Sequence, residues 1–449
     1  MVILLFVLPL LYSTFCGPLF AASANPDANV SRLIVNVADF DGGLIGTAFR
    51  SFISTYSPGV SIIVNNGASA VTIPGMTFVD SSVWTPERMR SSVIDASAYA
   101  SIYVNAGASA SLMNALSSPT LAATYDPSSA ITIIWDESRN SPVTTGRIGG
   151  LLKGLTGAFV EGFSANILAT QLPLAASSPL INTPQLYARL LAVPIFYSEE
   201  SLFPQTAPAI NIAAAVGQIL LVVFSLVTCN IVFMPLAPLS LHFSPGFPRA
   251  FARLAIFATF AAFLAAAFTT ILIGVSRNWN TTMLQPVYAP GVTYGAIHAN
   301  GIFDGNRWAQ IWAIQWLQCL VFALWLSLPC ILGKVQLAAT LLAPMIIFNA
   351  LSVNIDIADA GFQFFYYAPF WHTSEVMRFV LFGSLSTRVG MHVGVLVGWL
   401  VIELILFIAA HLKMAQTTTP SPDDDISSVS QPSETIEASS EKNDSTVSV

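Results

Sequence analysis

One carboxylate lies where a carboxylate is energetically costly. Glu403 interrupts an otherwise uncharged apolar block at residues 391–410. An ionised side chain in hydrocarbon is strongly destabilising unless it is neutralised or paired, so Glu403 should face other helices. Two interpretations are open. The functional one is a relay for protons or cations, or a binding site for a cationic drug. The other is a protonated acid hydrogen-bonded to a neighbouring helix.

Three amide side chains occur in similar settings. Gln315 and Gln318 lie three residues apart in an apolar block at 311–332, and Asn349 lies in a block at 335–353. Polar side chains in membrane helices point into the bundle and hydrogen-bond across helices. Together with Glu403, these residues are the predicted candidates for a transport path.

A second group of polar residues follows the block at 335–353. Asp356 and Asp359 precede an aromatic run at 362–371, and His372, Glu375 and Arg378 come directly after it. Aromatic rings gather at the headgroup level of membranes. One interpretation is a solvated interfacial segment, and the other is an outer gate or substrate vestibule.

Asp39 and Asp41 form a third arrangement, before Gly42 and Gly43 at the end of an apolar run. Two acids spaced by two on a strand share a face, as catalysis or Ca²⁺ binding would use. A turn capped by aspartate explains the same residues, and we favour it.

Other chemistry has no signature in this chain. There is no GxxxxGK[ST] loop, GxSxG, HExxH or paired Cys/His spacing. The cysteines, at positions 16, 229, 319 and 330, all fall in apolar blocks, so we expect no disulfide framework. We predict no enzyme, no cofactor and no metal site, and any ATPase that drives transport must be another chain.

The apolar blocks determine the class of protein. The chain has 449 residues, of which 54% are hydrophobic and 9% charged, against about one quarter charged in soluble domains. A bilayer core needs about 20 apolar residues per helix. Six stretches satisfy this requirement, at residues 2–22, 210–239, 254–275, 311–332, 335–353 and 391–410. We predict a polytopic α-helical membrane protein with about six spans.

The region between the first two spans has a different pattern. Four β-rich runs, at 33–37, 61–64, 100–104 and 130–135, are separated by Gly, Pro, Asn and Ser. Helices are expected at 85–96, where Thr85 and Pro86 make a good start, and at 144–172. The expected organisation is a first span at 1–23, an extracytoplasmic α/β domain at 24–208, a five-span membrane domain at 209–413 and a disordered cytoplasmic tail at 414–449.

The sidedness of the domain depends on weak signals. Lys and Arg are evenly divided between the two sets of short loops, so the positive-inside rule gives no answer. Two glycosylation sequons, at Asn29 and Asn280, fall on the face that carries the domain. They favour a non-cytoplasmic domain and predict a glycoprotein. The first block also suits a cleaved secretory signal, although a retained anchor is the favoured interpretation.

Several short motifs resemble a known family. They are the stretches at 37–43 (VADFDGG), 99–104, 125–127 and 136–139, followed near the C-terminus by 365–371 and 382–384. In this order they resemble the fungal nitrosoguanidine-resistance membrane protein family, which is similar to phage-infection proteins and ABC-2-type permeases. The layout of one span, a domain and five spans is the more specific part of the resemblance.

The resemblance implies a fungal plasma-membrane protein linked to drug or mutagen tolerance. It would move amphipathic compounds or lipids, or alter lipid asymmetry, and it supplies no catalytic residue. The alternative is a non-transporting scaffold whose external domain binds a partner protein. Expected partners are membrane lipids, small amphipathic compounds and a second copy of the chain. Nucleic acid is not expected, because no basic patch occurs.

Overall fold

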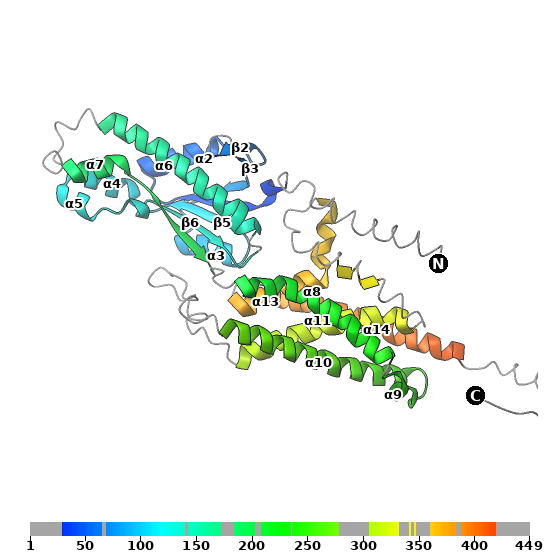
Figure 1. Cartoon of the computed structure of the whole chain (residues 1–449). Helices are drawn as coiled ribbons and strands as arrows, with labels where there is room; N and C mark the ends of the chain where they lie inside the picture. The colour runs from blue at the N-terminus through cyan, green and yellow to red at the C-terminus, as the bar shows by residue number, and fades with distance from the viewer. Residues whose placement is uncertain are drawn as a thin grey trace, which may run out of the picture.

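The computed structural model describes residues 29–64, 69–139, 142–171, 184–202, 208–234, 236–277, 305–331, 341–342, 345–346, 360–382 and 388–418. Within these residues the chain forms an α/β domain and then a bundle of apolar helices, and the two parts lie end to end (Figure 1).

The α/β domain is built on a five-stranded sheet of order β4-β1-β5-β6-β7. The strands are β1 (Ile34–Asp39), β4 (Gly75–Phe78), β5 (Ala100–Val104), β6 (Ile131–Asp136) and β7 (Tyr197–Leu202). Only the β5–β6 pair is antiparallel in this sheet. A separate hairpin pairs β2 (Ser61–Val64) with β3 (Ser69–Thr72). All four predicted strands are confirmed, whereas β3, β4 and β7 were not predicted.

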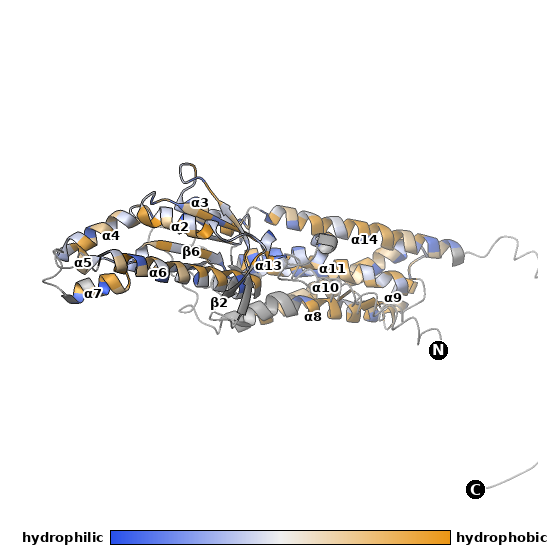
Figure 2. Cartoon of the chain, turned by 90° about the horizontal axis from the view of Figure 1, so that it is seen from above, coloured by the Kyte–Doolittle hydropathy of each residue, from blue (hydrophilic) through white to orange (hydrophobic). Residues whose placement is uncertain are grey.

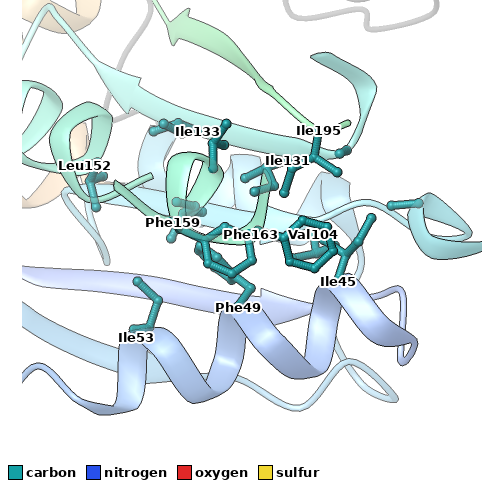
Figure 3. Packing of buried hydrophobic residues seen from close by; sticks show 14 of the residues in the cluster. Ile45, Phe49, Ile53, Val104, Ile131, Ile133, Leu152, Phe159, Phe163 and Ile195 are labelled. Carbon is teal, nitrogen blue, oxygen red and sulfur yellow. The ribbon is translucent and has the colours of Figure 1, made fainter. Parts of the chain in front are cut away.

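One face of the sheet carries most of the domain's core. It is covered by α2 (Leu44–Ser54) and α6 (Gly150–Gln171), with α4 (Ala108–Ser117), α5 (Pro119–Thr124) and α7 (Pro184–Ala192) beside them (Figure 1). Phe49 of α2 packs edge-on against Phe159 of α6, in the same cluster as Ile131 and Ile133 of β6 (Figure 3). A π-helical segment, Pro142–Gly149, leads into α6, so the predicted helix at 144–172 is confirmed with an irregular first part.

The opposite face is covered by α3 (Pro86–Ile94). Its start is as predicted, because the Thr85 hydroxyl accepts a hydrogen bond from the Arg88 backbone N–H at 3.3 Å and Pro86 occupies the first turn. Arg90, on the same helix, donates two hydrogen bonds to Glu200 of β7, at 2.5 and 2.7 Å. This buried ion pair ties the helix to the edge of the sheet.

The bundle consists of α8 (Pro208–Phe233), α9 (Ala237–Leu241), α10 (Phe247–Arg277), α11 (Gly305–Ile331), α13 (Pro369–Phe382) and α14 (Val389–Thr418), with a 3₁₀ segment at Ala360–Tyr367. The central helix is α11, which contacts α8, α10, α13 and α14. In its most apolar stretch 67% of the residues are buried, against 22% in α10 and 17% in α14. The outer helices therefore expose long apolar faces (Figure 2).

Among the described residues, three helices are long and apolar enough to cross a bilayer: Phe247–Leu272, Asn306–Ile331 and Val389–Gln416. They match three of the predicted spans and fit a membrane protein. Within α8, Gln218–Phe233 is a shorter apolar helix. The predicted span at 2–22 and most of that at 335–353 lie outside the described residues. The prediction that the second span reaches residue 239 is wrong: α8 ends at Phe233, before Pro235 and Pro238 in the sequence.

The domain and the bundle share a hydrophobic cluster. On the domain side it contains Tyr103 and Ile134 from the sheet with Met89 from α3, and on the bundle side it contains Val376 and Met377 of α13. Ile311 of α11 and Leu272 of α10 belong to the same cluster. α13 is thus buried between the sheet and the other helices.

Candidate functional site

The bundle interior holds a set of buried polar side chains, which we call the buried polar set: Gln218, Gln315, Gln318 and Glu403. The three amides are fully buried and Glu403 is 3% exposed. They come from α8, α11 and α14. The structure places Gln315, Gln318 and Glu403 in the interior as expected, while Asn349 lies outside the described residues. Their role in transport remains a prediction.

One stripe of α14 carries all of its buried ionisable side chains. The stripe contains His392, Leu396, Glu403, Phe407 and His411, whose spacings of four and seven keep them on one helical face. Val401 and Ile405 on the other side are 50% and 62% exposed. The helix therefore presents hydrocarbon outward and titratable groups to its neighbours.

Most atoms of the buried polar set lack a partner among the described residues. These atoms are Glu403 Oε2, Gln315 Nε2, and both amide atoms of Gln218 and of Gln318. One contact is made: the Thr269 hydroxyl donates to Gln315 Oε1 at 3.0 Å. Buried polar atoms are paired in the great majority of native structures, because each unpaired one costs about 1–3 kcal/mol. Atoms without a partner can form hydrogen bonds with the polar group of a bound solute.

Two histidines meet at the contact between α13 and α14. His372 Nδ1 lies 2.9 Å from His392 Nδ1, and both residues are 2% exposed. At this distance one nitrogen must donate and the other accept, so the two Nδ1 atoms share one proton. Trp371 packs edge-on against both rings. His372 was predicted from the sequence and His392 was not, although His392 lies on the same face of its helix as Glu403.

The interpretation of His372, Glu375 and Arg378 as a solvated interfacial segment is wrong. Glu375 is 5% exposed and forms an ion pair with Arg378, whose side chain is 15% exposed. The physical reason is the apolar side of α13, where Val376, Met377, Val380 and Leu381 join the cluster shared with the α/β domain. That domain covers a helix that alone would lie at the surface. Asp356 and Asp359 lie outside the described residues.

A buried acid lies in the α/β domain, close to the contact between this domain and α13. Asp136, the last residue of β6, is 1% exposed and accepts hydrogen bonds from the Ser138 N–H at 2.7 Å and the Ser138 hydroxyl at 2.6 Å. Burial raises the pKa of Asp136 to about 6, although these hydrogen bonds and the charges of Arg139 and Arg378 oppose the shift. Asp136 therefore links the 136–139 motif electrostatically to α13. The sequence motif at 136–139 was recognised, but Asp136 was not predicted as a site residue.

Arg139 belongs to the same motif and holds the adjoining turn. Its guanidinium lies 3.6 Å from the centroid of the Tyr99 ring, and its Nη1 donates to the carbonyls of Ala96 and Ala98, both at 3.3 Å. Tyr99 begins the other motif, at 99–104. Two of the motifs that carry the family resemblance thus meet in space.

Asp39 and Asp41 of the VADFDGG stretch cap a turn, which is the interpretation favoured from the sequence. Asp39 Oδ1 accepts from the N–H groups of Asp41 and Gly42, at 3.0 and 2.9 Å. Asp41 accepts from the N–H groups of Gly43 at 3.2 Å, Gly46 at 3.3 Å and Ser109 at 2.9 Å, and from the Ser109 hydroxyl.

This turn lies at the carboxyl ends of β1 and β5, parallel neighbours from which α2 and α4 begin. Such a crevice is the usual ligand site of open α/β sheets. Here the Asp41 carboxylate occupies the donors that would hold an anionic ligand. The arrangement is therefore structural, and neither a catalytic pair nor a cation site is indicated.

Two further expectations concern modification and metals. Asn29 is 4% exposed, so a glycan on it would require this side chain to turn outward, and Asn280 lies outside the described residues. Among the residues that the structure describes, no group of three or more His, Cys, Asp or Glu side chains could hold a metal ion.

The three apolar helices fit a helical membrane protein, and an α/β domain precedes them in the chain. The chain belongs to the family described as protein of unknown function DUF3533, whose model matches residues 1–405. No curated protein matches the chain, and no solved structure does.

Proposed function

We propose that this protein moves amphipathic compounds or lipids across the membrane and thereby affects tolerance to them. The observation that carries the proposal is the buried polar set, whose unpaired amide and carboxyl atoms lie inside helices with apolar outer faces. The resemblance to nitrosoguanidine-resistance proteins supports tolerance as the outcome. The plasma membrane is the proposed location.

The physical argument concerns the polar end of an amphipathic solute. In hydrocarbon this end has no hydrogen-bond partners, so its transfer is strongly unfavourable. Amides on α8 and α11 supply both donors and acceptors, and a carboxylate at Glu403 attracts a cation. Exchange of that cation for a proton would leave Glu403 neutral and release the solute. No nucleotide-binding motif occurs in the sequence, so we propose that an ion gradient or a partner protein supplies the energy.

The test removes the charge without changing the shape. Glu403→Gln, expressed in cells that lack the native protein, should lower efflux of a fluorescent cationic dye at an unchanged level in the membrane. Glu161→Gln is the matched control, because it makes the same chemical change at an exposed position on α6. A Glu403→Gln variant that exports the dye like the parent chain would exclude a role for this carboxylate in transport.

A second variant separates lipid movement from cation movement. Gln318→Leu removes both unpaired amide atoms from α11 and keeps a similar volume. We expect it to slow the passage of a fluorescent phospholipid between leaflets in reconstituted vesicles. Normal rates in both variants would favour the scaffold alternative, in which the helices anchor the α/β domain.

A further inference from the structure

A groove of about 490 Å³ lies between α10 and α11, outside the buried polar set. Three tryptophans of α11, four residues apart, form one wall: Trp308, Trp312 and Trp316. Their rings stack at centroid distances of 6.1 and 5.3 Å. The other wall is made of small residues and one ring of α10, namely Ala258, Thr259, Ala262, Phe263 and Ala266.

The polar atoms of the tryptophan wall are already used. Trp312 Nε1 donates to the Ala262 carbonyl at 3.0 Å, and Trp316 Nε1 donates to the Ala258 carbonyl at 2.9 Å. Trp308 Nε1 donates to the Thr270 hydroxyl at 3.3 Å. These bonds fix the rings against α10 and leave no indole N–H for a ligand. The groove therefore suits hydrocarbon.

The surroundings indicate the source of that hydrocarbon. Both helices are long and apolar enough to span a bilayer, and Phe263 at the groove is 71% exposed. In the membrane the groove opens to lipid, so its occupant is a lipid chain. From Trp308 to Trp316 the helix rises about 12 Å, which is less than half of a bilayer core of about 30 Å. A single acyl chain within one leaflet matches this length.

Charge at one end of the groove identifies the kind of lipid. The two helices run antiparallel, because Trp312 bonds to Ala262 and Trp316 to Ala258. Arg307, the residue before Trp308, therefore lies at the end of the groove towards which α10 ends. Cationic residues at a membrane surface attract anionic headgroup atoms. The phosphate of a glycerophospholipid complements this end.

We propose that the groove binds a glycerophospholipid in that leaflet, with one acyl chain along the three tryptophans and its phosphate beside Arg307. The site is independent of the proposed transport path, because its lining includes no member of the buried polar set.

The experiment uses the full chain in phosphatidylcholine vesicles doped with a phosphatidylcholine that carries a diazirine midway along one acyl chain. After illumination, labelled peptides are mapped by mass spectrometry. We expect more label on α10 and α11 at the groove than on the equally lipid-facing residues Val401 and Ile405 of α14. Equal labelling of the two faces would show only general contact with lipid and would overturn the proposal.

Variants locate the site more closely. Ala262→Leu fills the groove and should lower its labelling about fivefold, which corresponds to roughly 1 kcal/mol. Ala267→Leu, an exposed position of α10 outside the lining, is the matched control and should change nothing. Arg307→Gln, at a position outside the groove lining, should also lower the labelling. A diazirine sterol that labels the groove in preference to the phospholipid would overturn the assignment to a phospholipid.

Discussion

The sulfur atoms of Cys229 and Cys330 lie 3.5 Å apart, where α8 packs against α11. Both residues are buried, and a disulfide needs its sulfurs at about 2 Å, so a small movement would join them. We predict that a membrane-permeant azodicarboxamide oxidant joins the two sulfurs in a disulfide and so cross-links the helices. In this reaction the N=N group of the oxidant takes up the hydrogens of the two thiols. The closed loop should migrate faster on a non-reducing gel, and dithiothreitol should reverse the change.

Cys319 supplies the control for this cross-link. It lies on the same helix as Cys330 and is equally buried, but its contact is with Ser225. Cys319→Ser should keep the oxidised band and Cys330→Ser should lose it. A band that persists in Cys330→Ser would contradict the packing of α8 on α11.

The ion pair between Arg90 and Glu200 gives a second prediction. Their side chains are 7% and 13% exposed, so the loss of one partner leaves a poorly solvated charge. Arg90→Met should destabilise the protein by about 3 kcal/mol. Thermal unfolding of the purified chain in detergent would show the loss, and Arg90→Met with Glu200→Met should recover most of it.

The neighbouring pair is the natural comparison. Lys153 and Glu199 also lie 2.5 Å apart, but their side chains are 39% and 38% exposed. Water already solvates both charges, so Lys153→Met should destabilise by less than about 1 kcal/mol. Similar losses in the two single variants would mean that burial does not determine the strength of these pairs.

The sequence predicts the parts of the fold that depend on local patterns. Long uncharged blocks predict spans, and Thr85 with Pro86 predicts the start of α3. The strand β7 was not predicted because it includes Ser198, Glu199 and Glu200 and has no apolar alternation. Its structure depends on pairing with β6, from Ile131–Tyr197 to Asp136–Leu202. That pairing joins residues more than sixty positions apart, which no local pattern records.

In the candidate site, too, some features follow from local patterns and others depend on contacts between distant parts of the chain. Burial of Glu403, Gln315 and Gln318 follows from one rule, that polar groups avoid hydrocarbon. The contact between His372 and His392 depends on how α13 crosses α14, which residue spacing on one helix does not determine. The burial of Glu375 depends on the α/β domain lying over α13. The sequence of α13 does not show this contact, so it predicts a segment at the surface.

The turn around Asp41 gives a third prediction. Its carboxylate accepts hydrogen bonds from three backbone N–H groups and the Ser109 hydroxyl. Asp41→Ala leaves these donors without that acceptor at the starts of two helices, so the expected destabilisation is about 2–3 kcal/mol. Asp80→Ala is the control, because exposed Asp80 accepts from Ser82 N–H and should cost about 1 kcal/mol at most. Equal melting temperatures for the two variants would contradict a structural role for the turn.

The last prediction concerns pH and the junction between the domain and α13. The folded pKa of Asp136, about 6, is above its ordinary value of 3.8. Folding therefore favours the protonated acid, and the stability that this preference adds below about pH 4 is lost as the pH rises to about 6. The loss amounts to about 3 kcal/mol. Unfolding measured in detergent across this range should show the decline in the parent chain and a flatter profile in Asp136→Asn.

The control for this prediction has the same local geometry at the surface. Asp126 accepts from the Ser128 N–H at 3.0 Å and the Ser128 hydroxyl at 2.7 Å, as Asp136 does from Ser138, but Asp126 is exposed. Asp126→Asn should therefore keep the pH dependence of the parent chain. Above pH 6, Asp136→Asn should also be the more stable protein, because a neutral amide retains the acceptor for Ser138 without a buried charge. A decline that survives in Asp136→Asn would assign the pH dependence to other groups and remove the evidence that burial at the junction with α13 governs this acid.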